Sequence, residues 1–303
     1  MKALAILVSC VLLSILFVSG MTASRANPEV ILLGSAHVYH FQTQMHYSLI
    51  DLKNEIAALQ PNVVCGEITP EGYRNVMEGY FPPEAAYLAE VAPSLRARFV
   101  PADWRMADAW QSRAEKMVPK EKAAEEDKVE EKQKEGLEKY TGASVFDYLH
   151  SPAFIGLSDE KFEQVVGENT VSDLAYGAWH ERNRKIVENC LEAAPEARRI
   201  VFVFGANHLA QLRRQLAARG ITAQIAARRF TPAGMGAVPP AVLARWRKNL
   251  ENMQGILAGS TPVSIEWLDR IQHHPAPREV LALAIKTYES ASAGRSYDQN
   301  PEK

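Results

Sequence analysis

The 303-residue chain lacks an excess of charge of either sign. Lys and Arg together number 34 and Asp and Glu together number 36, which gives a formal net charge of -2. Nucleic-acid-binding domains carry a clustered basic excess, so we expect no nucleic-acid partner. The hydrophobic content of 47% is sufficient for one large globular domain or two small ones.

The chain also lacks the glycine-rich signatures of several enzyme classes. Ser35 is not part of the Gly-x-Ser-x-Gly turn that presents a serine nucleophile. Neither a P-loop nor a dinucleotide-binding fingerprint is present. Function therefore has to be argued from other residues.

Cysteine is scarce, with three residues in the chain. Cys10 lies inside an apolar run, Ala3 to Val18, that follows Lys2 and precedes small residues up to Ala26. This order is typical of a secretory signal. We predict that residues 1–26 are a signal peptide, or an N-terminal anchor that provides the sole contact with a membrane. Both alternatives predict a secreted or periplasmic protein.

Cleavage after residue 26 would leave Cys65 and Cys190. Two cysteines in an exported protein could form a disulfide, but their spacing does not decide the matter. Cys65 lies in a predicted strand and Cys190 on a predicted helix face, so two buried free thiols are an equally good interpretation.

Short apolar runs alternate with helical periodicity along most of the chain. This alternation predicts an α/β fold with a mainly parallel central sheet and flanking helices. The predicted strands are Glu29–Leu33, Asn62–Gly66, Ala97–Pro101, Arg199–Phe204 and Ile221–Ala226. The predicted helices are Tyr47–Leu59, Asp173–Glu192, 209–220, 242–257 and 280–288.

Composition divides the chain into further regions. The segment 113–139 is nearly all charged and favours a solvated helix or a mobile insertion. The segment 145–166 is expected to be helical and to cap the sheet edge. The predicted division is a first α/β half (27–108), a helical charged insertion or cap (109–172), a second α/β half (173–229), a C-terminal helical region (230–290) and a disordered tail (291–303).

Two Gly-x-x-His motifs each follow a predicted buried strand directly. They are Gly34-Ser35-Ala36-His37 and Gly205-Ala206-Asn207-His208. Glycine permits a sharp turn at a strand end, and ligands of open α/β sheets bind at the carboxyl ends of the strands. We therefore expect His37 and His208 to meet in one site.

Two carboxylates follow the other strands in the same manner. Glu67 comes after the second predicted strand and Asp103 after the third. Two imidazoles and one or two carboxylates are sufficient ligands for a divalent metal ion. The alternative without metal is a histidine general base that a carboxylate orients.

Arg182 and Asn183 fall on the apolar stripe of the helix predicted before the fourth strand. An arginine on such a face needs an anionic partner, so Arg182 is expected to hold a site carboxylate or a substrate oxyanion. The other interpretation is an arginine that extends to solvent. His40 and His46 could form a local metal clip, an interpretation we do not favour.

Taken together, these motifs resemble the TraB/GumN/Tiki superfamily, which is related to the erythromycin-esterase and ChaN-like proteins. The resemblance is carried by Gly34-x-x-His37, the strand ending at Glu67, Glu181-Arg182-Asn183 and Gly205-Ala206-Asn207-His208-Leu209, in that order. It covers most of the segment 30–226 and is greatest to a bacterial branch of exported proteins. Ser35 and Ala36 depart from the Thr-x that is commoner in the first motif, and Asn207 stands where a small residue is usual.

The resemblance implies an α/β fold with a helical cap. For Tiki-like members it also implies metal-dependent peptidase activity, with the roles carried by His37, His208 and Glu67. Arg182 and Asn183 match a recurrent pair near the site. Fold similarity does not by itself determine the reaction.

We therefore predict an exported, metal-dependent hydrolase of an amide or peptide bond in a small-molecule or peptide substrate. His37, Glu67 and His208 would hold Mn²⁺, Co²⁺ or Zn²⁺, with Asp103 as a further ligand or a supporting group. Arg182 and Asn183 would stabilise the developing oxyanion.

Two alternatives remain, and the oligomeric state is open. One is a non-catalytic binding protein for haem, iron or a small anion, with contacts from Tyr39, His40, Tyr73, Tyr80 and Phe81. The other is a metal-free, esterase-like hydrolase that uses His37 as the base.

Overall fold

Five strands form one parallel sheet in the order β3-β2-β4-β1-β5. The computed structural model describes residues 27–77, 82–263, 268, 271–272 and 276–292. The strands are β1 (Glu29–Ser35), β2 (Val63–Gly66), β3 (Arg98–Pro101), β4 (Arg199–Gly205) and β5 (Ala223–Ile225). The predicted α/β fold and its five strands are confirmed.

β1 and β4 are neighbours at the centre of the sheet. After its first residue, each strand is buried along its whole length, which explains why both read as continuous apolar runs. Their register pairs Gly34 with Phe204 and Ser35 with Gly205. The two Gly-x-x-His motifs therefore leave the sheet side by side, at the same edge.

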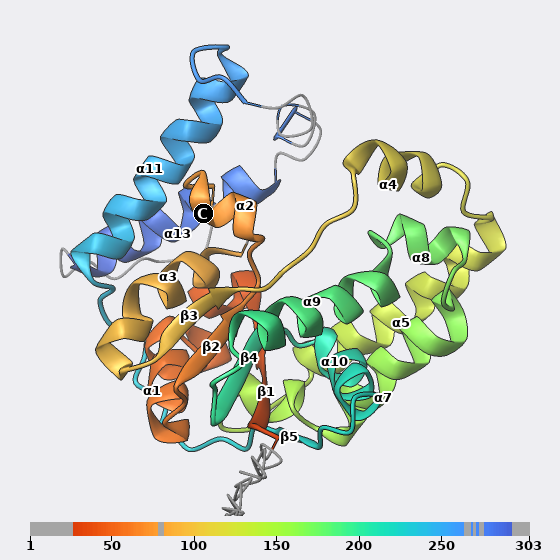
Figure 1. The fold of residues 1–303 in the computed structure, drawn as a ribbon, viewed down its shortest axis with the longest axis horizontal. Helices are drawn as coiled ribbons and strands as arrows, with labels where there is room; N and C mark the ends of the chain where they lie inside the picture. Colours follow the sequence, from red (N-terminus) through yellow and green to blue (C-terminus); the bar gives the residue numbers. More distant parts are fainter. Residues whose placement is uncertain (1–26, 78–81, 264–267, 269–270, 273–275, 293–303) are drawn as a thin grey trace, which may run out of the picture.

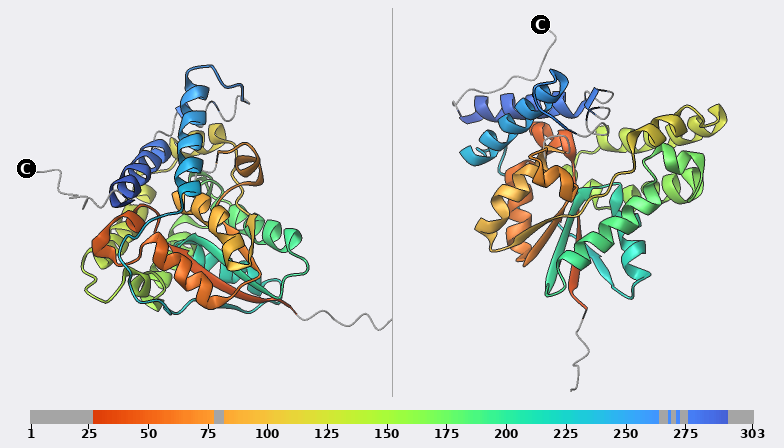
Figure 2. Two further views of the ribbon diagram at one scale, coloured as in Figure 1. Left: turned by 90° about the vertical axis from the view of Figure 1, so that its left-hand side faces the viewer. Right: turned by 45° about the horizontal axis from the view of Figure 1, so that its top comes forward.

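Helices cover both faces of the sheet (Figures 1 and 2). On one face lie α1 (Leu49–Leu59) and α3 (Pro83–Val91), and on the other lie α9 (Trp179–Ala193) and α10 (His208–Ala217). α1 begins two residues later than predicted, because Ser48 and Asp51 form a capping box. The remaining short elements before β3 are η1 (His37–Phe41), η2 (Thr43–Met45), α2 (Pro70–Arg74) and η4 (Ala92–Leu95).

The C-terminal helices pack beside α3. They are α11 (Pro240–Leu257) and α13 (Ala276–Ser292), which contact each other. In Figure 1 they lie at the upper left, and the helices inserted between β3 and α9 lie at the right. One continuous apolar core joins them to the sheet.

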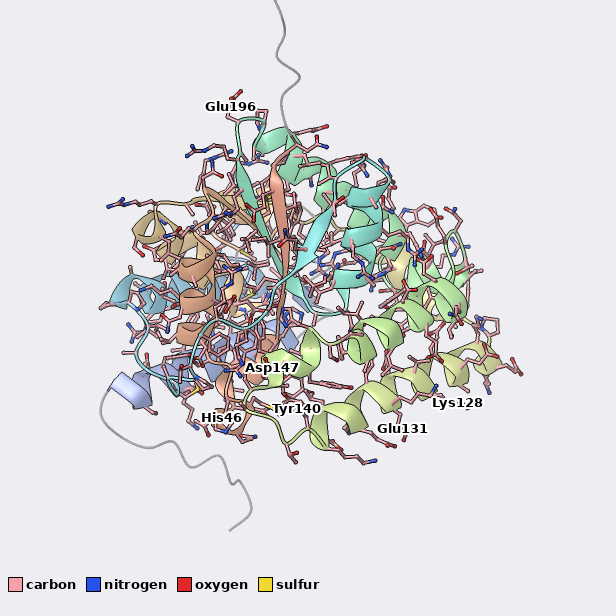
Figure 3. The ribbon with its side chains drawn as sticks, turned by 90° about the horizontal axis from the view of Figure 1, so that it is seen from below. His46, Lys128, Glu131, Tyr140, Asp147 and Glu196 are labelled. Carbon is pink, nitrogen blue, oxygen red and sulfur yellow. A yellow bond between two sulfur atoms is a disulfide. The ribbon has the colours of Figure 1, made fainter. Side chains whose placement is uncertain are left out.

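A helical insertion separates β3 from α9, as predicted. It comprises α4 (Asp108–Glu115), α5 (Lys120–Glu138), α6 (Val145–Leu149), α7 (Pro152–Asp159), the π-helical turn η5 (Glu160–Val166) and α8 (Val171–Ala175). Charged side chains such as Lys128 and Glu131 cover the outer surface of α5 (Figure 3). Val129, Gln133 and Leu137 are buried on its inner side. The charged segment is therefore a packed helix with one solvated face.

The single helix predicted over Asp173–Glu192 is wrong. The chain forms α8 and α9, separated by a turn at Tyr176–Ala178. Gly177 has a φ of 77° and Ala178 a φ of 54°, which a right-handed helix does not accommodate. The break lets α9 begin at Trp179 with its own direction.

Cys65 and Cys190 form a disulfide with a Cα–Cα distance of 6.0 Å. The sequence left open whether these cysteines are bonded or free, and the structure shows that they are bonded. The disulfide joins β2 to α9.

Several predictions lie outside the described residues. They are the signal or anchor segment 1–26, the contacts expected from Tyr80 and Phe81, and the tail beyond residue 292. Across the described part of the chain, no helix combines the length and the apolar character that a membrane crossing needs.

Candidate functional site

The first motif places His37 between two carboxylates. Its Nδ1 lies 2.7 Å from Oε1 of Glu84, and its Nε2 lies 3.9 Å from Oε2 of Glu67. The backbone of His37 is left-handed, with a φ of 48°, a strained conformation that is common at functional sites. The ring stays partly accessible, since its side chain is 43% exposed.

These carboxylates also govern the charge of His37. Burial lowers the pKa of the imidazole, but the charges of Glu84 and Glu67 outweigh burial and raise that pKa to about 9. Solvent at the exposed side of the ring screens part of this effect. The imidazole is thus held in its protonated form near neutral pH, and a metal ion bound at Nε2 would displace that proton.

Glu67 is the group at which the site converges. Its Oε2 accepts a hydrogen bond of 2.8 Å from the backbone N–H of Gly205, and its Oε1 accepts one of 2.9 Å from Nη2 of Arg182. Burial raises the pKa of this carboxyl, but the charges of His37 and Arg182 outweigh burial and lower it. Glu67 is therefore an ionised carboxylate that the second motif and α9 hold in place.

The second motif directs His208 at the same carboxylate. Asn183 donates from Nδ2 to the carbonyl of Trp179 at 2.8 Å, which orients its Oδ1 towards His208. Nδ1 of His208 donates to that oxygen at 2.7 Å. This bond assigns the proton to Nδ1 and leaves Nε2, which lies 4.0 Å from Oε1 of Glu67, as the free lone pair.

His208 is also kept neutral. Burial is the largest cause that lowers its pKa well below the ordinary value, and the charge of Arg182 adds to it. The two histidines of the site thus differ in charge although they belong to similar motifs.

Asp103 lies behind Arg182. Its oxygens accept from Nε and Nη2 of Arg182 at 2.8 and 3.0 Å, from Nε of Arg105 at 2.9 Å and from the backbone N–H of Trp104 at 2.8 Å. Burial raises the pKa of Asp103, but the charges of Arg182 and Arg105 outweigh burial and lower that pKa below its ordinary value. Of the two roles predicted for Asp103, these contacts correspond to the supporting one, because its oxygens face the guanidinium groups.

The two glycines of the motifs permit this close approach. A Cβ at Gly34 would lie 3.0 Å from the Cβ of Ala206, and one at Gly205 would lie 2.2 Å from Nε2 of His37. Side chains at either position would separate the two loops or displace the imidazole.

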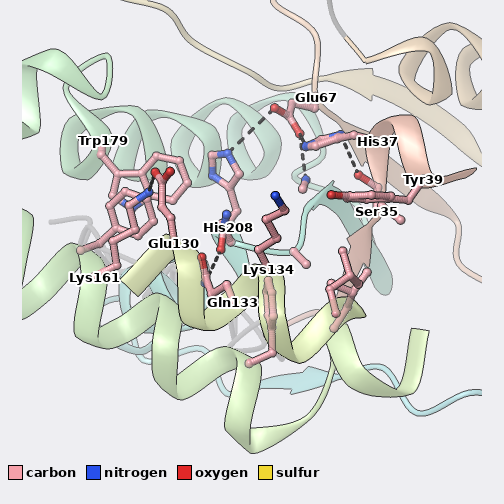
Figure 4. A pocket seen from close by; sticks show the side chains of 18 of the residues that line it. Ser35, His37, Tyr39, Glu67, Glu130, Gln133, Lys134, Lys161, Trp179 and His208 are labelled. Carbon is pink, nitrogen blue, oxygen red and sulfur yellow. Dashed lines mark hydrogen bonds and ion pairs between the residues drawn. The ribbon is translucent and has the colours of Figure 1, made fainter. Parts of the chain in front are cut away.

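A cavity of about 430 Å³ opens over these groups (Figure 4). Its base includes His37, Glu67, Arg182 and His208. The insertion contributes the opposite side, and the lining residues from α5 are Glu130, Gln133, Lys134 and Leu137. The insertion is therefore part of the site, which the sequence alone did not show.

Gln133 fastens α5 to the second motif. Its Nε2 donates to Oδ1 of Asn207 at 2.9 Å and lies 3.0 Å from Oγ of Ser158, which itself donates to Asn207 at 2.8 Å. Asn207 thus serves as the anchor for the insertion.

Besides the residues of α5, Glu84 and His150 were missed in the sequence. Glu84 follows Pro82 and Pro83 in the first turn of α3, so no strand end marks it. His150 accepts a hydrogen bond of 2.8 Å at Nε2 from the backbone N–H of Gly34. The position of His150 in the insertion gave no signal of a contact with the first motif.

His40 and His46 do not form a metal clip with His37. Nε2 of His40 accepts from the N–H of Ala36 at 3.0 Å, and its Nδ1 donates to the carbonyl of Tyr47 at 2.7 Å. Both ring nitrogens are therefore occupied by backbone groups. His46 is exposed.

Among the residues that the structure describes, no three or more His, Cys, Asp and Glu side chains are gathered closely enough to chelate a metal ion. The donor types nevertheless suit one, because two imidazole nitrogens and a carboxylate face one another within 4.0 Å of Glu67. No family model, curated protein or solved structure matches the chain. The function must therefore be argued from these residues.

Proposed function

We propose that the protein is a hydrolase of an amide or peptide bond that works outside the cytoplasm with a divalent Zn²⁺, Mn²⁺ or Co²⁺ ion. His37, Glu67 and His208 would hold the ion. The observation that carries the proposal is the convergence of two Nε2 atoms, from motifs on adjacent strands, on one carboxylate. The resemblance to the TraB/GumN/Tiki superfamily points the same way.

The second nitrogen of each imidazole supports this assignment. Metal-bound histidines almost always donate their other N–H to an acceptor, which fixes the tautomer and the orientation of the ring. Glu84 provides that acceptor for His37, and Asn183 provides it for His208. Both Nε2 atoms are thereby directed to the same place.

The ion would lower the pKa of a water molecule and polarise the scissile carbonyl. The other groups have roles of their own. Arg182 lines the cavity beside Glu67, so its guanidinium provides positive charge where an oxyanion develops. Asp103 keeps the guanidinium in that orientation.

A metal-free hydrolase is the second candidate, and one observation favours it. The site already contains an acid and a base, because the pKa of His37 is raised to about 9 while that of His208 is lowered well below its usual value. In that version His37 is the proton donor, contrary to the base role expected from the sequence.

Metal analysis of the purified protein separates the two candidates. We expect nearly one equivalent of metal in the wild type and in the exposed control His46→Ala, and very little in His37→Ala and His208→Ala. Hydrolysis of a peptide panel should cease with a chelator and return with one metal. Hydrolysis that persists under chelation would replace the metal version by the metal-free one, and a protein that cleaves neither amides nor esters would overturn both.

A further inference from the structure

We propose that the substrate carries a free carboxylate close to the scissile bond and that Lys134 of the insertion binds it. This inference rests on the proposed hydrolase function and specifies its substrate class. The substrates of this class are peptides that are cleaved before their C-terminal residue, and N-acylated amino acids.

The position of Lys134 follows from the geometry of α5. Glu130, Gln133, Lys134 and Leu137 are spaced three and four residues apart, so they share one face of the helix. All four line the cavity. In Figure 4 Lys134 extends from α5 towards Glu67 and His37.

Gln133 keeps that face in register with the site. It is 8% exposed and bonds Asn207 of the second motif and Ser158 of α7. Because Lys134 is the next residue, the hydrogen bonds of Gln133 position the helix backbone from which the side chain of Lys134 extends.

Among the described residues that line the cavity, Lys134 is the cation with the weakest internal pairing. Arg182 is paired with the buried Asp103 and Glu67, His37 with the buried Glu84, and Lys161 with Glu130. Nζ of Lys134 lies 3.8 Å from Glu138, but the two side chains are 71% and 62% exposed. An exposed ion pair of that kind contributes little, so a carboxylate entering the cavity competes with it easily.

The cavity also offers an apolar surface next to this cation. Leu137, Leu149 and Phe154 line it and are nearly buried, and Tyr39 lies at its edge. A volume of about 430 Å³ falls within the range of small-ligand sites, roughly 300–1,000 Å³. An apolar residue with its terminal carboxylate matches both features.

Calorimetric binding tests the inference without requiring turnover. The probes are N-acetylated dipeptides with an apolar second residue, each as the free acid and as the C-terminal amide. We expect the wild type to bind the free acids about two- to fivefold more tightly than the amides, the range for an ion pair whose cation is largely exposed. Lys134→Met should abolish this preference, and Lys134→Arg should retain most of it.

The matched control is Lys128→Met, since Lys128 is exposed on the outer side of the same helix (Figure 3). It should bind as the wild type does. For probes that are hydrolysed, Lys134→Met should raise KM for the free acid, leave kcat nearly unchanged and leave the amide unaffected. Equal binding of acid and amide, no binding of either, or an unchanged preference in Lys134→Met overturns the inference. If the protein prefers free carboxylates but hydrolyses none of the probes, the role of Lys134 stands and the proposed hydrolase function is wrong.

Discussion

The carboxylate of Glu84 lies 2.7 Å from Nδ1 of His37 and is 2% exposed. Burial raises the pKa of Glu84, but the charge and the hydrogen bond of His37 outweigh it and hold that pKa at about 2. The two groups therefore stabilise each other's charge, and α3 takes part in the site although none of its residues was predicted to.

We predict that Glu84→Gln, which keeps an acceptor oxygen but removes the negative charge beside His37, weakens metal binding by about 10–100-fold, the usual loss when the hydrogen-bond partner of a metal-bound histidine is mutated. Hydrolysis should fall by a similar factor. The affinity is measured by competition with a chromogenic chelator. Glu90→Gln is the control, because Glu90 lies on the same helix but pairs with Arg245. If Glu84→Gln bound the metal as tightly as the wild type, Glu84 would not support His37 as a metal ligand.

Arg182→Met should destabilise the fold as well as the site. The substitution leaves the buried carboxylates of Asp103 and Glu67 without their main cation, a change that costs about 3–5 kcal/mol. Urea unfolding measures the loss. In Arg184→Met, which removes a half-exposed arginine paired with Glu181 and Glu188, the loss should stay below about 1 kcal/mol. Equal effects of the two substitutions would contradict this ranking.

His150 should make the protein sensitive to acid. Burial lowers its pKa to about 4, below the unfolded value of about 6.5. The unfolded chain thus binds more protons between these values, so stability falls as the pH drops from about 6.5 to 4, by about 3 kcal/mol in all. His150→Gln should flatten that part of the profile of unfolding free energy against pH, whereas the exposed control His46→Gln should not. If the profile of His150→Gln ran parallel to that of the wild type, His150 would not be the source of the acid sensitivity.

The disulfide should stabilise the site edge of the sheet. Cys65 and Cys190 are 125 residues apart, and the loss of a native disulfide typically costs about 2–5 kcal/mol. Cys65→Ser/Cys190→Ser should lower the unfolding free energy by that amount in urea. Thiol titration of the denatured full chain should find one free thiol before reduction and three after it, since the chain has three cysteines. Three free thiols before reduction would disprove the bond.

The sequence predicted the position of a site residue best where that residue directly follows a strand. Glycine and histidine after β1 and β4 could be placed at one edge, because parallel strands end on the same side. Glu67 and Arg182 were found by the same reasoning, from a strand end and a helix stripe. Arg182 was also expected to hold a site carboxylate, but its bonding of both Glu67 and Asp103 was not predictable, because contacts between elements depend on how helices pack.

Glu84, His150 and Gln133 illustrate the remainder. Glu84 and Gln133 lie on helices and His150 directly follows α6, and each reaches the site through tertiary packing. The composition of α5 predicted its solvated face correctly. Its buried face has too few apolar residues to be recognised within a charged run. The break at Gly177 was missed because one glycine in a helical pattern is usually tolerated.

The place of β1 between β4 and β5 has a consequence for synthesis. Gly34 pairs with Phe204, 170 residues later in the chain. At about 5–20 residues per second, this apolar strand waits roughly 10 to 30 seconds after leaving the ribosome before either neighbour exists. Throughout that time β1 has no native strand to pair with, so the sheet and the site both assemble only when the second motif has emerged.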